Sequence, residues 1–441
     1  MCVGHITDIH LKFYEKTVLL IFLAFSTLLM KTIKTPSKLL ISLLLSLLIV
    51  VSVNVNAETC PPVERDWSHL QFNENGKFEI MIVADIQIGN HGLDHATRRF
   101  LYVALSHPSN ANIDLIVLLG DNLASDPALR DGGYVAAIRS YMDIFWHFQI
   151  PVAVVFGNHE WNASGPGDLM PQVRVFQEFP NTIMMVQDPE YTEYRDGNEF
   201  FIAELDRDGR NTPSIGNYNL LISSSCGTNP LAYNLWFFYT GSSPAELGGF
   251  DGVRDATLNW YDWKSKRLQA RNGGNVVPSI VLQHVPVHRE VSLDEDNFID
   301  NTPPNEFNFR PSRSFAVSEL RYRNQYARHQ ARGDVEAIFF GHEHSNHFWY
   351  FPEPSACGLP GIPLIFTGRS ALCRRHTSIG PFAVVRVITI KEELINQEGV
   401  SFTTRTYAAD ARYPVPADAW GNLQPKMDVL ADFERLFHGI E

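Results

Sequence analysis

The sequence has few cysteines and few basic residues, and both shortages exclude classes of protein. Its five cysteines include no C-x-x-C pair, which argues against a thiolate zinc site and a dithiol redox motif. Lysine and arginine number 36 against 49 acidic residues, and the formal charge is −13. Because a nucleic-acid binder needs a basic surface, we expect no nucleic-acid-binding surface. An anionic substrate is not excluded, since bound metal ions supply local positive charge.

The N-terminal region has the composition of a secretory signal. The apolar run Leu39–Val53 follows three lysines and precedes a small-residue cleavage pattern that ends at Ala57. This pattern predicts a signal peptide that starts at Met30, so that residues 1–57 are removed from a secreted or lumenal protein without a stable membrane span. The alternative is a membrane anchor, although the run is shorter than the roughly 20 residues of a spanning helix.

Four cysteines remain once the signal is removed, and in an oxidising lumen they allow three pairings. Sequence separation favours Cys357 with Cys373 and leaves Cys60 with Cys226. Buried free thiols are the alternative. A glycosylation sequon begins at Asn162 and is compatible with secretion.

From Phe78 onward, strand-like runs alternate with helical patterns. Three successive runs read FEIMIVAD, IDLIVLLGD and PVAVVFGNHE. Continuous Val/Ile/Leu runs spaced by helices predict parallel strands covered on both faces, in an α/β fold. Three further runs, EFFIAEL, NYNLLISS and NLWFFYTG, follow one another without helices. They predict antiparallel pairing in a second sheet, with the aromatic run in the core.

The expected organisation is a lead-in at 58–77, one domain at 78–412 and a tail at 413–441 that packs on the domain. The loop Ser292–Pro311 is rich in Asp, Asn and Pro. Its length suggests a lid or an insertion.

Polar side chains gather where five of the apolar runs end. They are Asp85, Gln87, Asp121, Asn122, Asn158, His159, Glu160, His284, His288, His342 and His344. Taken singly, each of these residues has an ordinary explanation. An Asp at a strand end is often a helix N-cap, a lone His is often a buried side chain with its hydrogen bonds made, and Gly-Asn is often a turn. Their conjunction favours one shared site, because ligands bind outside the carboxyl ends of strands in open α/β sheets.

Oxygen and imidazole donors without thiolate suit Mn, Fe, Zn or Mg. Two such ions, roughly 3.5–4 Å apart, clamp a phosphoryl oxygen and activate water. We therefore expect two divalent or mixed-valence ions at this rim.

Together these motifs resemble those of the calcineurin-like metallophosphoesterases. The spellings LLGDN, VFGNHE and FGHEHSNHF are closest to single-domain proteins similar to purple acid phosphatases, and the resemblance covers Phe78 to Tyr407. It implies a four-layer α/β/β/α sandwich of two mixed β-sheets flanked by helices. It also implies hydrolysis of a small-molecule phosphate ester or a phosphorylated substrate at a dinuclear metal centre.

The resemblance also implies a role for each matched residue. Asp85, Gln87 and His344 would bind the first metal, Asp121 would bridge both metals, and Asn158, His284 and His342 would complete the second. His159 would face the leaving group as general acid or as a stabiliser of charge. Glu160 would orient His159 from behind.

Two positions depart from the family pattern. Ala124 stands where purple acid phosphatases carry a tyrosine, so a purple chromophore is not expected and iron is less assured. Gln87 stands at the position of a histidine. Its carbonyl oxygen is a harder, weaker ligand, which predicts a looser site that favours Mg or Mn over Zn. Alternatively, Gln87 hydrogen-bonds a metal-bound water or has no role at the metal.

Three further residues are candidates for substrate contacts. His91 could replace Gln87 as a ligand or touch substrate, and His288 and Arg369 could contact a phosphate. The ordinary alternatives are solvated histidines and a structural salt bridge. The functional alternatives are a phosphodiesterase or nucleotide pyrophosphatase of the same fold, and a catalytically silent binding protein, which Gln87 alone supports.

Overall fold

The computed structural model describes residues 69–160, 169–184, 203–205, 211–213, 215–241, 252–287, 298–299, 324–344, 346, 349–350, 352, 358–372, 382–397 and 399–410. All of them belong to one compact unit, Cys60–Glu441. The expected signal peptide, the sequon at Asn162, most of the loop Ser292–Pro311 and the tail at 413–441 lie outside the described residues. So do His288 and every cysteine except Cys226.

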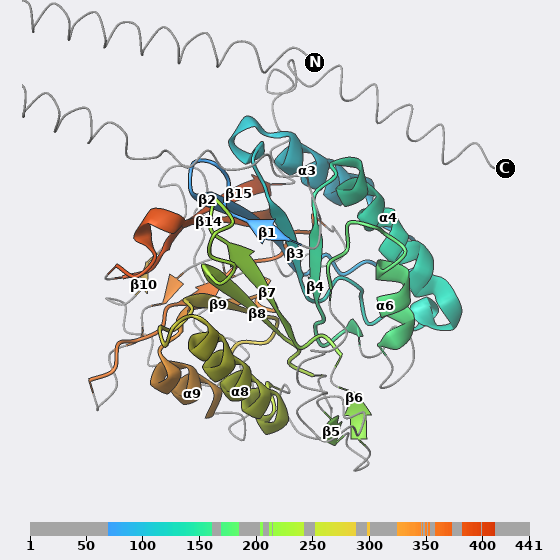
Figure 1. Ribbon diagram of the computed structural model, residues 1–441. Helices are drawn as coiled ribbons and strands as arrows, with labels where there is room; N and C mark the ends of the chain where they lie inside the picture. The colour runs from blue at the N-terminus through green and yellow to red at the C-terminus, as the bar shows by residue number, and fades with distance from the viewer. Residues whose placement is uncertain are drawn as a thin grey trace, which may run out of the picture. The chain divides into compact units, whose positions relative to one another are not determined.

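A five-stranded mixed sheet contains the first three predicted strands. Its order is β15-β14-β2-β3-β4, in which β2, β3 and β4 are parallel and β14 is antiparallel to β2 and β15. The strands are β2 (Lys77–Val83), β3 (Leu115–Leu119), β4 (Val152–Val155), β14 (Phe382–Lys391) and β15 (Phe402–Asp410). Three helices cover its outer face (Figure 1): α3 (His95–Ser106), α4 (Gly133–His147) and α6 (Met170–Phe176).

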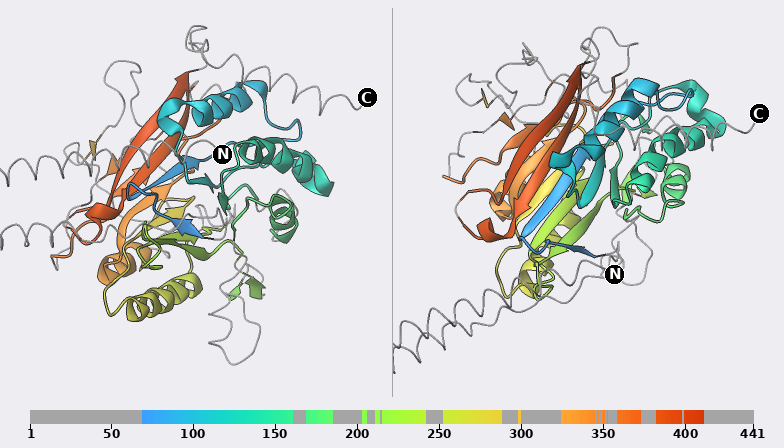
Figure 2. Two further views of the ribbon diagram at one scale, coloured as in Figure 1. Left: turned by 45° about the horizontal axis from the view of Figure 1, so that its top comes forward. Right: turned by 90° about the horizontal axis from the view of Figure 1, so that it is seen from above.

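An eight-stranded mixed sheet packs against the first, and its order is β1-β7-β8-β9-β11-β13-β12-β10. Its strands are β1 (Leu70–Gln71), β7 (Tyr218–Ser223), β8 (Tyr233–Phe238), β9 (Ser279–Gln283), β10 (Phe298–Ile299), β11 (Val335–Phe340), β12 (Trp349–Tyr350) and β13 (Leu364–Phe366). Helices α8 (Asp255–Arg271) and α9 (Asn324–Arg332) lie on its outer face. Figure 2 shows the two sheets face to face between the helix layers.

The central strands of the second sheet are buried on both faces, which explains their unbroken apolar runs. In β8, Leu235 and Phe237 belong to the core between the sheets, while Trp236 and Phe238 belong to the core under α8 and α9. All four side chains are fully buried. The prediction that this aromatic run is core is therefore confirmed, and the four-layer α/β/β/α architecture is confirmed with it.

Two segments differ from expectation. The run EFFIAEL was expected in the second sheet, but β5 (Ala203–Leu205) pairs with β6 (Asn211–Pro213) in a separate two-stranded sheet. The expectation was wrong because β1 occupies the free edge of β7 as a parallel strand. The lead-in at 58–77 thus supplies a strand to the sheet. NYNLLISS and NLWFFYTG pair antiparallel as predicted.

Within the part of the chain that the structure describes, no helix has the length and apolar character needed to cross a membrane.

Candidate metal centre

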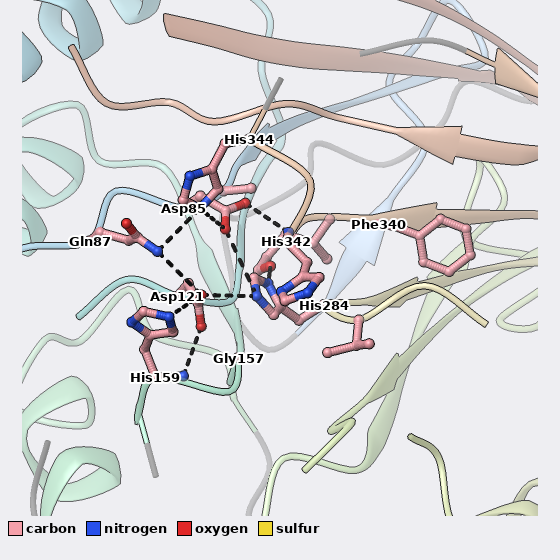
Figure 3. Close-up of polar contacts among 12 residues, drawn as sticks. Asp85, Gln87, Asp121, Gly157, His159, His284, Phe340, His342 and His344 are labelled. Carbon is pink, nitrogen blue, oxygen red and sulfur yellow. Dashed lines mark hydrogen bonds and ion pairs between the residues drawn. The ribbon is translucent and has the colours of Figure 1, made fainter. Parts of the chain in front are cut away.

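The predicted site residues converge where strands of both sheets end. Asp85 and Asp121 follow β2 and β3 of the first sheet, whereas His284 follows β9 of the second. The sheets meet at this point, because His284 Nε2 lies 3.2 Å from Asp121 Oδ2 and 3.8 Å from Asp85 Oδ1. Figure 3 shows these side chains and those of Gln87, His342 and His344 pointing toward one another.

The backbone at these strand ends adopts an uncommon conformation. Asp85, Gln87, Asp121 and His342 all have positive φ, between 48° and 66°. Non-glycine residues visit this region rarely, and such strain collects at functional sites. Hydrogen bonds hold the strained turns in place: Asp85 N donates to Gly120 O at 3.0 Å, and Gln87 N donates to Asp121 O at 2.9 Å. The loops after β2 and β3 therefore present their side chains as one unit.

Two glycines of the motifs leave room for this convergence. A Cβ atom added to Gly157 would overlap the backbone nitrogen and Oδ1 of Asp121. A Cβ atom added to Gly341 would lie 2.8 Å from both Leu119 O and His284 Nδ1. The glycine that precedes Asn158, like the one that precedes His342, is thus needed because another strand end approaches its backbone closely.

Two groups of side chains can each hold an ion, and they share one carboxylate. The first group is Asp85, Asp121 and His344, and the second is Asp121, His284 and His342; within each group the ligand atoms lie within 4.8 Å of one another. His344 Nε2 lies 3.3 Å from Asp85 Oδ1. Asp121 is therefore the residue common to both groups.

The electrostatics of the cluster favour bound positive charge. Burial opposes ionisation of Asp121, but the neighbouring His284 outweighs it and lowers the pKa of Asp121 below its usual range. Burial likewise opposes the charge on His284, yet Asp121 and Asp85 raise its pKa to about 10. Burial and the adjacent charge of His284 lower the pKa of His342 to about 4. The two buried carboxylates thus draw cationic charge into the site.

Buried polar atoms provide a direct test of whether ions fit here. Among the described residues, Asp85 Oδ1, Asn158 Oδ1 and His284 Nε2 are buried and have no hydrogen-bond partner. A buried polar atom without a partner calls for a water, ligand or ion, and here three such atoms belong to predicted ligands of one centre. The other ring nitrogen of His284, Nδ1, lies 2.9 Å from Leu119 O. That bond makes Nδ1 the donor, so in the neutral ring, the form that binds a metal ion, Nε2 carries the lone pair and faces the carboxylates. The residues present therefore fit a pair of divalent ions.

His159 lies at the rim and belongs to neither group of ion ligands. Its side chain is 30% exposed, and its Nε2 lies 3.5 Å from Asp121 Oδ2. The backbone N–H of Ser125 donates to His159 Nδ1 at 3.0 Å. In the neutral ring Nδ1 is then the acceptor, so Nε2 carries the proton and can donate to a bound substrate.

Glu160 has partners other than the one expected. Its fully buried carboxylate contacts the backbone of the Asp121 loop instead of the ring of His159, which Ser125 holds. Four N–H groups donate to it: Asp121 at 3.1 Å, Asn122 at 2.5 Å, Leu123 at 3.1 Å and Gly157 at 2.8 Å. Burial and the charge of Asp121 raise the pKa of Glu160 to about 7. Glu160 therefore fixes the position of Asp121 from behind.

We expect Glu160→Gln to weaken metal binding by roughly 10- to 100-fold, the usual cost of losing a supporting partner. The amide accepts through one oxygen only and presents an NH₂ group to N–H donors. Competition with a chromogenic chelator measures the change. Glu336→Gln is a suitable control, because Glu336 is a half-buried carboxylate away from the site that also accepts a backbone N–H, from Ser401. If both variants melt earlier and neither loses metal affinity, Glu160 is only structural.

The remaining predicted residues are placed as follows. His91 lies exposed in the turn after Gln87 and belongs to neither ion group. Arg369 is buried, and its backbone N–H donates to His344 O at 3.3 Å, so it lies beside the cluster. Sequence reasoning missed Ser125 and Leu119. They act through backbone atoms, which leave no signal in residue type.

A family model described as calcineurin-like phosphoesterase matches residues 78–346, which is more than half of the chain. The chain belongs to this family, and the resemblance read from its motifs is confirmed.

Two curated relatives from Arabidopsis thaliana are similar to it. "Probable inactive purple acid phosphatase 29" is 27% identical over 329 residues, which cover 68% of this chain and 73% of that protein. "Probable inactive purple acid phosphatase 14" is 24% identical over 372 residues, covering 77% and 82%. Among solved structures, a dimetal phosphatase from Danio rerio is 13% identical, with a TM-score of 0.42, over 75% of this chain and 99% of that one.

Proposed function

We propose that this chain is an active, metal-dependent hydrolase of phosphate esters. The observation that carries the proposal is the shared position of Asp121 between two groups of ion ligands, together with the orphaned atoms of Asp85, Asn158 and His284. Bound there, a pair of divalent ions would offset the charge of a phosphate and supply a nucleophile from water for in-line attack on phosphorus. His159 would either transfer its Nε2 proton to the oxygen of the departing group or donate a hydrogen bond that stabilises the negative charge developing on that oxygen.

The opposing proposal is a catalytically silent binding protein. The names of both Arabidopsis relatives include "probable inactive", and Gln87 departs from the expected histidine. Against this, the other six proposed ligands and His159 are all present in this chain. The buried carboxylates of Asp85 and Asp121, at strained backbone positions, support an ion-binding centre under either proposal, so turnover is the measurement that separates them.

We place the protein in the secretory pathway or outside the cell. Cys226 is disulfide-bonded, and its partner cysteine lies outside the described residues. Disulfides persist in oxidising compartments, which supports the proposed signal peptide at 30–57. The metallophosphoesterase domain at 78–412 and the tail at 413–441 stay predictions. The metal ions would be Mn, Fe, Zn or Mg, and the substrate a small phosphate ester or a phosphorylated molecule.

The test uses purified full-length protein that has been stripped by a chelator and reloaded with Mn, Mg, Zn or Fe ions. We expect one or more of these ions to restore hydrolysis of p-nitrophenyl phosphate between acidic and neutral pH. A parallel assay with bis-p-nitrophenyl phosphate distinguishes monoesterase from diesterase activity, because the ion pair itself does not fix that choice. Absence of turnover with every ion and both substrates would overturn the proposed hydrolase and favour the silent binding protein.

A further inference from the structure

Gln87 is the one proposed ligand whose residue type differs from the family pattern, and the structure gives it a defined place. Its terminal nitrogen, Nε2, lies 3.1 Å from His344 Nε2 and 3.4 Å from Asp121 Oδ2. Both partners belong to the group formed by Asp85, Asp121 and His344. Figure 3 shows the amide end of Gln87 facing these two side chains.

These separations match those between neighbouring ligands of one ion. Atoms bound at about 2.1 Å from a common ion lie roughly 3.0–3.4 Å apart in octahedral or tetrahedral geometry. The distance from His344 Nε2 to Asp85 Oδ1, 3.3 Å, falls in the same range. The end of the Gln87 side chain thus stands where a further ligand of the first group would be.

The backbone holds Gln87 in this position. Its φ is 48°, and its N–H donates to Asp121 O at 2.9 Å. An amide nitrogen has no lone pair for a metal, but a half-turn of the terminal amide brings Oε1 to the same point. The ligand offered is then a neutral carbonyl oxygen, which suits Mg²⁺ and Mn²⁺, whereas imidazole suits Zn²⁺ and Fe²⁺.

The second group of ligands is of a different kind. It contains two imidazoles, His284 and His342. Asn158, which is buried, follows Gly157, and the backbone of Gly157 lies against Asp121 and His284. His284 is fully buried and is fixed by Leu119 O. By contrast, the first group contains one imidazole, His344, whose side chain is 17% exposed. Each group also contains one partly exposed histidine, His342 or His344, so burial does not distinguish the two groups. The second group is the more imidazole-rich site, and the ring of its His284 is fixed.

We infer that Gln87 divides the centre into two unequal sites that fill in order. The first equivalent of metal occupies the site of Asp121, His284 and His342. The second equivalent binds more weakly, at the site that contains Gln87. This site favours Mn²⁺ and Mg²⁺ over Zn²⁺. This inference rests on the two-ion centre proposed above, and it makes Gln87 the residue that sets metal selectivity.

Titration of the stripped protein with Mn²⁺, followed by electron paramagnetic resonance, tests the order of filling. We expect the first equivalent to give the spectrum of isolated Mn²⁺. The second should bind at a concentration about tenfold higher or more, the ratio needed for the sites to fill in order, and should convert that spectrum to one of a coupled pair. Binding of both equivalents together, with the coupled spectrum from the start, would overturn the inference.

Two variants test the role of Gln87 by calorimetry with Mn²⁺ and Zn²⁺. Gln87→His should tighten the second equivalent of Zn²⁺ more than that of Mn²⁺. Gln87→Ala should weaken the second equivalent of Mn²⁺ and leave the first unchanged. Equal effects on both metals, or no effect of either variant, would overturn the inference.

Gln149→His is the matched control. It tests whether a newly introduced histidine binds Zn²⁺ wherever it stands on the protein. Gln149 also has a positive φ, 53°, is exposed, and precedes β4 at the end of that strand opposite the site. It should leave both equivalents unchanged. These readouts are independent of turnover. Sequential, Gln87-dependent binding without hydrolysis refutes only the proposed function, whereas hydrolysis with two equal sites refutes only the inference.

Discussion

Replacement of Asp121 by asparagine is expected to abolish phosphoesterase activity and to remove at least one metal ion. Asp121 is 1% exposed, and it belongs to both ligand groups. Its Oδ2 lies within 3.5 Å of His284 and His159, and its Oδ1 accepts the backbone N–H of His159 at 2.9 Å. The amide loses the charge that offsets two cations, so the change reaches both ion sites at once. We expect turnover to fall by more than the roughly 10²–10³-fold that one charge-stabilising donor is worth.

Elemental analysis of the purified variant measures the loss of metal directly. Asp94→Asn is the control, since it makes the same chemical change at the N-cap of α3. Asparagine caps a helix about as well as aspartate, so this variant should keep its metal, its activity and its melting temperature. Retention of two ions by Asp121→Asn, at full occupancy, is incompatible with a bridging role for Asp121.

Much of the architecture could be predicted because the strands are buried on both faces. A central strand that is buried on both faces, such as β3, is apolar along its whole length, and this produces the unbroken runs in the sequence. The polar residues that interrupt these runs then mark the strand ends. Convergence of Asp85 and Asp121 follows from that pattern once the strands are parallel. The approach of His284 depends also on how the second sheet packs against the first.

The parts that could not be predicted depend on backbone atoms and sheet edges. Nothing in the sequence indicates that Leu119 O would fix His284 or that Ser125 N–H would fix His159, because every residue carries those groups. The place of β5 was missed because a two-residue strand, β1, takes the edge beside β7. The partners of Glu160 were missed for the first reason: they are four backbone N–H groups.

Replacement of His159 by alanine is expected to lower turnover by roughly 10²–10⁴-fold, the usual contribution of a positioned proton donor. Unlike the Asp121 variant, it should keep both metal ions, since His159 lies in neither ligand group. The loss should depend on the leaving group. A p-nitrophenolate ion departs readily, whereas an alkoxide needs a proton or a hydrogen bond, so the loss should be larger for an alkyl phosphate.

Steady-state rates on one aryl and one alkyl phosphate, with metal analysis of the same preparation, check both parts of this expectation. His107→Ala is a suitable control, because His107 contacts Ser109 and Tyr407 and likewise belongs to neither ligand group. It should alter stability at most.

Loss of metal in His159→Ala would make His159 a ligand. An equal loss of rate on the two esters would mean that His159 acts on the attacking side or on the charge of the transferred phosphoryl group. Only the combination of full metal content and a leaving-group-dependent rate assigns His159 Nε2 to the departing oxygen.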